Sequence, residues 1–401
     1  MNITGIITEY NPFHNGHKFH LEESKKQTKS DGTICIMSGN FVQRGGPAII
    51  DKWKRTEMAL NNGVDLIIEL PTFYAVSSAE FFAKGAVSIL NSLNIVNNLF
   101  FGSEIGDAKA LSEIAKTLIS EDERFQNILK ENLSLGLTFA KAREKSLIEY
   151  LNNSEINNII TSSNNILGIE YIKAILKLNS SINPVALKRE GSNYNDKSLS
   201  QTFSSATSIR EVLKNTSNIE DLKNIIPLES YEVFSKLQEQ DYRFNFEEEM
   251  FKYIKYKIQT NCVNFNNLYE VTEGLDNKII KEISSSNSLH EFILKIKSKR
   301  YTYSKISRIL THIYLGLDND DFKDIANENN LYVRVLGFNK TGREILSLIK
   351  ANSSIPLITK VPRFTNNPLL KFDLQATACY SLLNDKVNPF NDYLQSPIIK
   401  Y

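Results

Sequence analysis

The chain has 401 residues, a formal net charge of +1, 41% hydrophobic residues and 23% charged residues. This apolar fraction excludes a disordered chain, and 17 glycines and 10 prolines are too few for a fibrous protein. The near-neutral charge excludes a global attraction to nucleic acid or to an anionic membrane, so any such binding must rest on a local patch. Because a single hydrophobic core stops growing near roughly 250–300 residues, we expect at least two domains.

Short apolar runs alternate with helical patterns in the first half of the chain. Buried strands are predicted at Ile3–Thr8, Thr33–Met37, Asp65–Leu70, Asn98–Phe101 and Pro184–Leu187. Helices are predicted at Gly16–Lys29, Trp53–Asn62, Ala79–Leu93 and Ile166–Leu178. This alternation is typical of a Rossmann-like α/β domain, whose parallel sheet is covered on both faces and binds ligands at the carboxyl ends of its strands.

The second half of the chain is mainly helical from about residue 205, with helix-period apolar positions at Phe246–Ile258 and Ile283–Arg300. A last mixed segment follows, with strands predicted at Leu331–Gly337 and Pro356–Lys360. Its helices are predicted at Gly342–Lys350 and Leu374–Leu383. We therefore predict three units: an α/β domain at 1–215, a helical region at 216–325 and a small α/β segment at 326–401.

Glycine and cysteine usage give two further indications. Ten of the 17 glycines lie in the first 106 residues, which predicts that the chemistry sits early, since glycine permits close backbone approach to ligands. Cys35, Cys262 and Cys379 are odd in number and far apart, which favours reduced thiols and a cytoplasmic location. The sequence contains no apolar run of about 18 residues, so no membrane-spanning helix is expected, and the N-terminus lacks the pattern of a signal peptide.

Two loops, Ser38–Lys52 and Arg189–Thr202, are long enough to be lids or binding loops.

The turn after the first predicted strand concentrates histidine. Three of the five histidines, His14, His17 and His20, lie within seven residues at the start of a predicted helix. A helix N-terminus offers free amides and a positive dipole end, Gly16 lets phosphate oxygens approach, and imidazoles supply donors. The pattern predicts a phosphate-binding corner. Around a helix the three rings spread too widely to hold one metal ion, so no protein metal site is predicted, and ordinary surface histidines are the plain alternative.

A later segment, SSATSIR at Ser204–Arg210, has the features of a second anion site. Its hydroxyls and early amides suit an anion at a helix start, and Arg210 can act as a charge clamp. Serine-rich helix starts are common, so this segment alone carries little weight. Together with the histidine corner, however, it matches a known pair of motifs.

His14, Asn15, Gly16 and His17 match the HxGH signature of the nucleotidylyltransferase superfamily, and SSATSIR resembles its later ISSTxxR-type segment. Longer blocks resemble the bacterial tRNA(Met) cytidine acetate ligases: GIITEYNPFHNGH, MSGNFVQRGGPAIIDKWKRTEMAL, GVDLIIELP, SSNNILGIEYIKA, ALKREG, SSATSIR and KSKRYTYSKISRIL. They span residues 1 to about 310. The resemblance implies activation of acetate by ATP as acetyl-adenylate, then acetyl transfer to the exocyclic amine of the wobble cytidine of elongator tRNA(Met). It also implies magnesium.

The resemblance implies roles for individual residues. His14, His17 and Arg210 would be catalytic, because they absorb charge as the carboxylate displaces pyrophosphate, and no side-chain nucleophile is needed. ATP contacts are implied at Ile7, Thr8, Glu9, Tyr10, Asn11, Pro12, Phe13, His14, Asn15, Gly16, His17, Lys18, Phe19 and His20. Further ATP contacts are implied at Gly102, Asn164, Asn165, Lys188, Arg189, Ser205 and Thr207. Which member of each pair, Asn164 or Asn165 and Lys188 or Arg189, makes the contact stays open.

The loop MSGNFVQRGGP is predicted to form the acetate pocket. A two-carbon acid offers little surface, so a few donors such as Asn40, Gln43 or backbone amides must hold it beside a small apolar wall. Arg44 with Gly45 and Gly46 would give a mobile cationic loop.

A dense basic segment follows near residue 300. Lysines and arginines interleaved with tyrosines suit a phosphate backbone with stacked bases, and they are Lys295, Lys297, Lys299, Arg300, Tyr301, Tyr303, Lys305 and Arg308. We therefore predict that this segment binds tRNA. A weaker basic face at Phe251–Lys257 is interpreted as a solvated helix.

Two other functions fit parts of the sequence: a small-molecule adenylyltransferase, for which the chain is long, and a tRNA-binding protein that only senses ATP. A class I aminoacyl-tRNA synthetase is disfavoured because no KMSKS-like segment is found. The sequence leaves open the oligomeric state and how one tRNA is distinguished from others.

Overall fold

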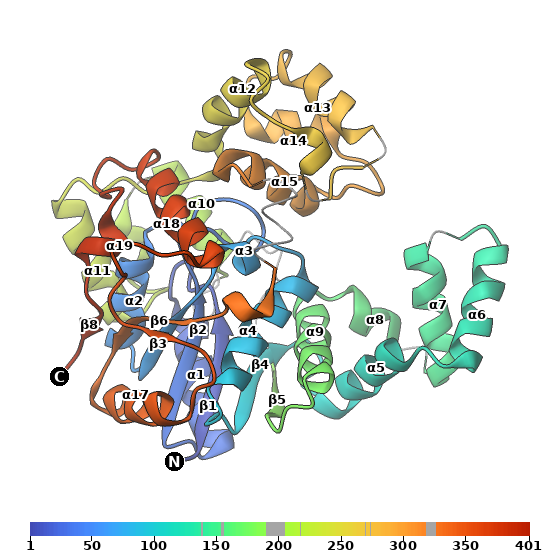
Figure 1. Ribbon diagram of the computed structural model, residues 1–401, viewed down its shortest axis with the longest axis horizontal. Coiled ribbons are helices and arrows are strands. Elements are labelled where there is room, and N and C mark those ends of the chain that lie inside the picture. The colour runs from blue at the N-terminus through green and yellow to red at the C-terminus, as the bar shows by residue number, and fades with distance from the viewer. Residues whose placement is uncertain are drawn as a thin grey trace.

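A single sheet forms the centre of the computed structural model, which describes residues 1–401 except 138, 154–155, 190–204, 217, 269, 273 and 318–325 (Figure 1). Its eight described strands run in the order β5-β4-β1-β2-β3-β6-β7, and β8 pairs with β6. The strands are β1 (Ile3–Thr8), β2 (Gly32–Ser38), β3 (Leu66–Leu70), β4 (Asn98–Ser103), β5 (Asn183–Lys188), β6 (Val333–Phe338), β7 (Leu357–Ile358) and β8 (Ile398–Ile399). The predicted α/β fold with a Rossmann-like sheet is confirmed.

The five strands of the first 188 residues are parallel, and their sequences explain why. All seven residues of β2 and all five of β3 are buried, as expected for strands covered on both faces. The order β5-β4-β1-β2-β3 means that the chain steps outward from β1 to β3 and then crosses back to β4. The order therefore reverses between β1 and β4, and ligands of such sheets bind at this point.

The crossover helices follow the predicted pattern closely. They are α1 (Asn15–Thr28), α2 (Lys52–Asn61), α4 (Ala79–Ser92) and α9 (Ser163–Lys177), with the short α3 (Thr72–Ala75) after β3. Right-handed crossovers place α1 and α2 on one face and α4 on the other, because the step from β3 to β4 runs in the reverse direction. Gly5 of β1 lies directly under Leu90 of α4, where an added Cβ would be 2.9 Å from the leucine methyls.

An insertion that the sequence did not predict lies between β4 and β5. It consists of α5 (Ala108–Ser120), α6 (Glu123–Ser134), α7 (Phe139–Leu151) and α8 (Ile156–Thr161). The α6–α7 pair projects away from the sheet as an arm (Figure 1). Near its tip Leu135 and Phe139 are 67% and 59% exposed.

The helical region begins with α10 (Ala206–Thr216) and α11 (Leu228–Glu239). It continues with α12 (Phe251–Gln259), α13 (Leu275–Ile283), α14 (Leu289–Ile296) and α15 (Tyr303–Leu315), which gather at the top of Figure 1. Short 3₁₀ turns at Ile219–Leu222, Glu247–Met250 and Phe265–Asn267 lie between these helices, and another at Glu328–Asn330 precedes β6. The buried Leu289, Phe292, Ile293 and Ile296 of α14 follow the helical spacing that predicted this region.

The last segment joins the sheet of the first. It contains β6, α17 (Lys340–Asn352), β7, α18 (Pro368–Ser381), α19 (Asn391–Leu394) and β8. β6 pairs antiparallel with β3, and α18 begins at Pro368 rather than at the predicted Leu374. The predicted division into units at residues 215 and 325 stays a prediction, although the third range shares the sheet of the first range.

A buried ionic cluster ties this last segment to the first. Lys52 Nζ lies 2.7 Å from Glu69 Oε1 and 2.8 Å from Asp392 Oδ1, and all three side chains are 3% exposed or less. Charges this far from water are retained only when they are paired, so the cluster links the start of α2, the end of β3 and α19.

Candidate functional site

His14 and His17 form the start of α1, directly after the turn that follows β1. His14 is the N-cap, and its Nδ1 accepts a hydrogen bond from the Gly16 backbone at 3.0 Å. His17 Nδ1 accepts from the His14 backbone at 3.3 Å, which completes a capping box built from imidazoles. Because Nδ1 is the acceptor in both rings, each neutral imidazole carries its proton on Nε2. The cap therefore leaves the Nε2–H of each ring as a donor, and that of His17 has the Pro12 carbonyl within reach.

The two imidazoles are held by packing as well as by hydrogen bonds. Their ring centroids are 3.8 Å apart with planes at 26°, so the rings are stacked. The ring centroids of Tyr10 and His17 are 5.0 Å apart in an edge-on arrangement, and those of Phe13 and His17 are 5.7 Å apart. His20 packs against Phe100 at 5.0 Å. Fixed rings of this kind present their donors without losing rotamer entropy when an anion arrives.

The charge of the corner comes from arginines, not from the imidazoles. Burial, followed by the Arg189 and Arg210 guanidinium groups, lowers the pKa of His14 to about 3. Burial and Arg189 lower the pKa of His20 to about 4, and burial with the neighbouring histidines keeps the pKa of His17 well below its usual value. All three rings are therefore neutral at pH 7, and each keeps one N–H.

Arg210 brings the two sequence motifs together across 199 residues. Its Nη1 donates to the Asn11 carbonyl at 2.7 Å, and its Nη2 donates to Thr207 Oγ1 at 3.2 Å. Ser205 Oγ accepts from the Ser208 backbone at 3.1 Å, as a capping hydroxyl does at a helix start. The start of α10 therefore faces the turn before α1. Residue 204 and most of the predicted loop Arg189–Thr202 lie outside the described residues.

Opposite the histidine corner, the ends of β4 and β5 form a second wall of the site. This wall lies across the point where strand order reverses. The Arg189 backbone donates to the Ser103 carbonyl at 2.9 Å. A Cβ at Gly102 would be 3.4 Å from Arg189 Cγ, so this glycine and this arginine are in contact. Asn165 is fully buried beside Ser103, whereas Asn164 is half-buried and Lys188 is exposed. The residues that the sequence linked to ATP in this part of the chain do converge on one place.

The loop Ser38–Lys52 is fastened to the turn after β1. The Gln43 backbone donates to Glu9 Oε1 at 2.7 Å, and the Ile49 backbone donates to Asn11 Oδ1 at 2.8 Å. Asn40 is 2% exposed, with Nδ2 donating to Thr377 Oγ1 at 3.1 Å and Oδ1 accepting from the Lys52 backbone at 2.8 Å. Both ends of its amide are thus already used within the protein, whereas the Gln43 side chain is half-buried.

Sequence reasoning missed Arg55. Its buried guanidinium donates to the carbonyls of Glu9 at 2.7 Å, Ser38 at 2.9 Å and Ile50 at 3.2 Å, and also to that of Gly39. It therefore holds together the carboxyl ends of β1 and β2 and the end of the loop. An arginine among the apolar positions of a predicted crossover helix was the available signal.

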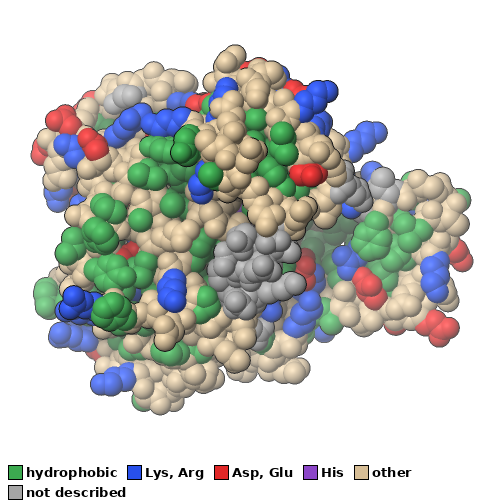
Figure 2. All heavy atoms as spheres, turned by 45° about the horizontal axis from the view of Figure 1, so that its top comes forward, with side chains coloured by type: hydrophobic (Ala, Val, Ile, Leu, Met, Phe, Trp, Pro, Cys, Tyr) green, Lys and Arg blue, Asp and Glu red, His purple; other side chains and the backbone are tan. Residues whose placement is uncertain are grey.

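The predicted tRNA-binding segment divides into an exposed and a buried part. Lys297, Lys299, Arg300 and Tyr303 are exposed, and Figure 2 shows lysine and arginine side chains at the outer margin of the helical region. Tyr301 is instead 6% exposed, with its hydroxyl donating to the Thr272 carbonyl at 2.6 Å. Its ring belongs to the core and is not available for stacking, which corrects the expectation for this residue.

The remaining members of that segment also have structural contacts. Arg308 is 9% exposed, and its backbone lies against the loop Ser38–Lys52. A Cβ added at Gly45 of that loop would be 2.5 Å from the Arg308 backbone nitrogen. Lys295 Nζ lies 2.7 Å from Glu291 Oε1, and Lys305 Nζ lies 5.0 Å from the Tyr301 ring centroid. In the weaker basic face, Lys257 donates to the Ile313 carbonyl at 2.9 Å.

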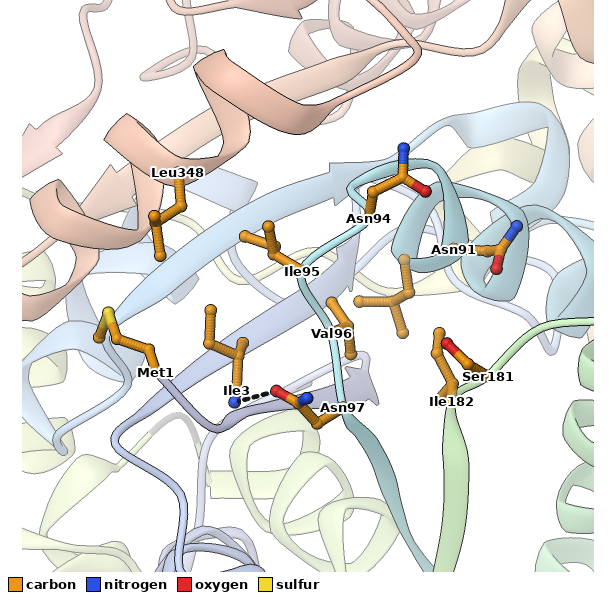
Figure 3. A pocket seen from close by; sticks show the side chains of 11 residues that line it. Met1, Ile3, Asn91, Asn94, Ile95, Val96, Asn97, Ser181, Ile182 and Leu348 are labelled. Carbon is orange, nitrogen blue, oxygen red and sulfur yellow. Dashed lines mark hydrogen bonds between the residues drawn. The ribbon is translucent and has the colours of Figure 1, made fainter.

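A pocket of about 400 Å³ opens far from the histidines (Figure 3). Ile3, Asn97 and Ile182 line it from the amino ends of β1, β4 and β5, opposite to the carboxyl ends that carry the site. No helix in the described ranges is long and apolar enough to cross a membrane. The described residues contain no group of three or more His, Cys, Asp or Glu side chains that could hold a metal ion.

Comparison with known proteins agrees with this geometry. The model of the HIGH Nucleotidyl Transferase family matches residues 1–393. Two relatives are named tRNA(Met) cytidine acetate ligase. The one from Clostridium novyi (strain NT) is 51% identical to this chain, over 99% of this chain and 99% of its own length. The one from Clostridium tetani is 47% identical, over the full length of both chains.

Two crystal structures of Thermotoga maritima TmcAL are also similar. The TM-score is 0.92 for the apo form and 0.88 for the form bound with alpha-thio ATP. Each structure is 32% identical to this chain, over 100% of this chain and 99% of the solved chain. The whole chain is therefore matched both by its relatives and by these structures. The chain belongs to the tRNA(Met) cytidine acetate ligase family of HIGH nucleotidyl transferases, which confirms the resemblance carried by its motifs.

Proposed function

We propose that this protein is an ATP-dependent ligase that acetylates the exocyclic amine of the wobble cytidine in elongator tRNA(Met). The observation that carries the proposal is the pair of stacked, neutral imidazoles whose Nε2–H donors lie at a helix N-terminus beside Arg210. Neutral donors and guanidinium groups suit a triphosphate. With reduced thiols and a tRNA substrate, we place the protein in the cytoplasm.

The reaction needs two steps and no nucleophile from the protein. An acetate oxygen attacks the α-phosphorus of ATP, the new P–O bond forms as the bond to pyrophosphate breaks, and acetyl-adenylate results. His14 and His17 donate to phosphate oxygens while Arg210 and Arg189 balance the growing charge. The cytidine amine then attacks the acetyl carbon, AMP leaves, and the amine gives up a proton.

ATP binding is proposed for the turn and first helix at Ile7–His20 and for the opposite wall. On that wall Gly102 permits close approach, Asn165 and Arg189 supply donors, and Ser205 and Thr207 lie at the start of α10. Magnesium is proposed to enter with the nucleotide. It prefers phosphate oxygens and water to an all-protein cage. When bound, it would neutralise phosphate charge.

The loop Ser38–Lys52 is proposed to hold acetate. Gln43 is the candidate that contacts the acid, since its backbone is fixed by Glu9 while its side chain is half-buried. Asn40 is proposed to shape the loop, because its amide is bonded to Thr377 and Lys52. We expect Gln43→Ala and Asn40→Ala to raise the KM for acetate in pyrophosphate release without raising that for ATP. An unchanged acetate KM in both variants would reject the assignment.

The tRNA surface is proposed to include Lys297, Lys299, Arg300 and Tyr303, which are exposed at the end of α14 and the start of α15. Reversal of Lys299 and Arg300 to Glu should weaken tRNA binding and reduce its salt dependence while sparing acetyl-adenylate formation. The matched control reverses Arg343 and Lys350, which are exposed on α17 at the other end of the molecule (Figure 1). Equal loss in both variants would argue against this surface.

Mass spectrometry of nucleosides from tRNA incubated with protein, ATP and labelled acetate tests the whole proposal. The expected product is an acetylated cytidine at the wobble position of elongator tRNA(Met). Pyrophosphate release with a phosphorylated cofactor precursor instead of acetate would indicate a small-molecule adenylyltransferase. Absence of release with any acid, with or without tRNA, would indicate a protein that only senses ATP.

A further inference from the structure

Glu104 and Asn165 interlock the turn after β4 with the start of α9. Glu104 Oε1 accepts from the Asn164 backbone at 3.2 Å and from Asn164 Nδ2 at 2.8 Å, while Oε2 accepts from the Asn165 backbone at 2.9 Å. In return, Asn165 Oδ1 accepts from Ser103 Oγ at 2.8 Å and from the Glu104 backbone at 2.9 Å. The two segments are about 60 residues apart, so Glu104 caps a helix that is distant in sequence.

These contacts fix the orientation of the Asn165 amide. Its oxygen faces several donors, so the opposite end of the amide is Nδ2. Asn165 is 0% exposed, and its Nδ2 has no hydrogen-bond partner in the described part of the chain. A buried amide donor without a partner costs free energy, and such donors in native proteins call for an explanation.

The position of Asn165 supplies that explanation. Ser103, which donates to its oxygen, directly follows Gly102 and accepts a hydrogen bond from the Arg189 backbone at 2.9 Å. Asn165, which carries the unused donor, is therefore part of the wall proposed to face ATP, on the β4 side of the reversal in strand order. The two negative oxygens of Glu104 are directed to the N-terminus of α9, where the helix dipole favours them, rather than to the phosphates.

We propose that Glu104 is a positioning residue for the nucleotide: it holds the start of α9 so that Asn165 Nδ2 donates to an acceptor on the base or ribose of ATP. This inference rests on the proposed function. It assigns the contact to Asn165 rather than to Asn164, whose side chain is bonded to Glu104. Glu104 touches no substrate and acts through Asn165.

The test replaces Glu104 with Gln, which keeps its shape but sets an N–H against the Asn164 or Asn165 backbone N–H. We expect the KM for ATP in acetate-dependent pyrophosphate release to rise about tenfold, with kcat and the KM for acetate within about twofold. Asp107→Asn is the matched control, because Asp107 caps α5 through Lys109 and Ala110 in the same turn without touching Asn165. It should leave both the melting temperature and the KM for ATP nearly unchanged, because the asparagine oxygen still accepts from Lys109 and Ala110 and asparagine caps a helix about as well as aspartate.

A double-mutant cycle decides whether Glu104 acts through Asn165. Asn165→Ala should raise the KM for ATP about as much as Glu104→Gln, and the double variant should be no worse than Asn165→Ala alone. Additive effects, an ATP KM unchanged in Glu104→Gln, or an equal rise in Asp107→Asn would each overturn the inference. The unmodified enzyme separates this from the larger proposal: if it releases no pyrophosphate with acetate, the proposed function fails and not the role of Glu104 alone.

Discussion

His14 and His17 illustrate how local hydrogen bonds determine chemistry at the scale of single residues. An ordinary capping box uses a hydroxyl and a carboxylate, and the carboxylate would repel an incoming phosphate. Imidazoles accept through Nδ1 and still carry a proton on Nε2, so one ring that caps the helix is able to donate to an anion as well. The same two residues therefore stabilise α1 and prepare the site.

Replacing His14 or His17 with Ala should lower kcat for acetate-dependent pyrophosphate release by about 10²–10³-fold, because a donor aimed at developing charge is lost. The exposed His290 on α14 provides the control, and His290→Ala should leave the rate unchanged. A fall of less than about threefold in both corner variants would contradict a catalytic role.

The lowered pKa values of His14 and His20 also predict how stability depends on pH. Burial lowers the pKa of His14 to about 3 and that of His20 to about 4, whereas the value in the unfolded chain is 6.5. Between about pH 6.5 and 4 the unfolded chain therefore binds protons that the folded chain does not. The free energy of unfolding is fully retained above this window and falls through it by up to about 1.4 kcal/mol per pH unit for each ring.

Melting curves between pH 7.5 and 4.5 would check this dependence. A variant with His14 and His20 replaced by Asn should lose stability less steeply than the unmodified protein as the pH falls. Parallel slopes for the two proteins would show that these rings do not contribute.

At the scale of elements, α15 is bonded both to the loop Ser38–Lys52 and to the end of α3. Ser307 Oγ donates to the Gly45 carbonyl at 2.9 Å, and His312 Nε2 lies 2.9 Å from the Val76 carbonyl. The bond from Ser307 thereby fastens α15 to the loop proposed to hold acetate. The contact requires a glycine, since Gly45 has φ +83° and no room for a Cβ.

Gly45→Ala should lower the free energy of unfolding by about 2–3 kcal/mol more than Gly63→Ala. Both glycines have positive φ, but a Cβ at Gly63 meets nothing within 4 Å, whereas one at Gly45 lies 2.5 Å from the Arg308 nitrogen. The difference therefore isolates the steric contact from backbone strain. Thermal unfolding measures it, and equal losses would mean that the loop moves aside at little cost.

Helices and strands were predicted well where the apolar residues recur with a strong local period. The β1 strand matches its predicted bounds, and α4 differs by one residue at its end. Contacts over long separations were not predicted, because composition and spacing do not reveal which segments meet. The pairing of β6 with β3, the Arg55 contacts and the burial of Tyr301 belong to this group. The histidine corner was predictable since its contacts lie within four residues.

At the scale of the whole molecule, the buried ionic cluster makes the two ends of the chain depend on each other. Lys52 at the start of α2 contacts Asp392 in α19, and Arg334 of β6 donates to the Asp392 carbonyl at 3.1 Å. Removing one partner of such a cluster leaves a buried charge uncompensated. The α/β domain and the last segment should therefore unfold in one transition.

Asp392→Ala should lower the free energy of unfolding by about 3–5 kcal/mol, as measured by urea denaturation. Asp385→Ala is the control, because Asp385 is exposed and its loss should cost less than about 0.5 kcal/mol. A small effect of Asp392→Ala would mean that Glu69 alone compensates Lys52.

The antiparallel pairing of β6 with β3 has a consequence for biosynthesis. Residues 333–338 leave the ribosome long after β1–β5, so the nascent polypeptide must wait with one side of β3 uncovered while more than 250 residues are translated. An uncovered strand of five apolar and acidic residues, Leu66–Leu70, is a template for wrong partners. Truncated or stalled translation products of this protein are therefore expected to aggregate or to recruit chaperones.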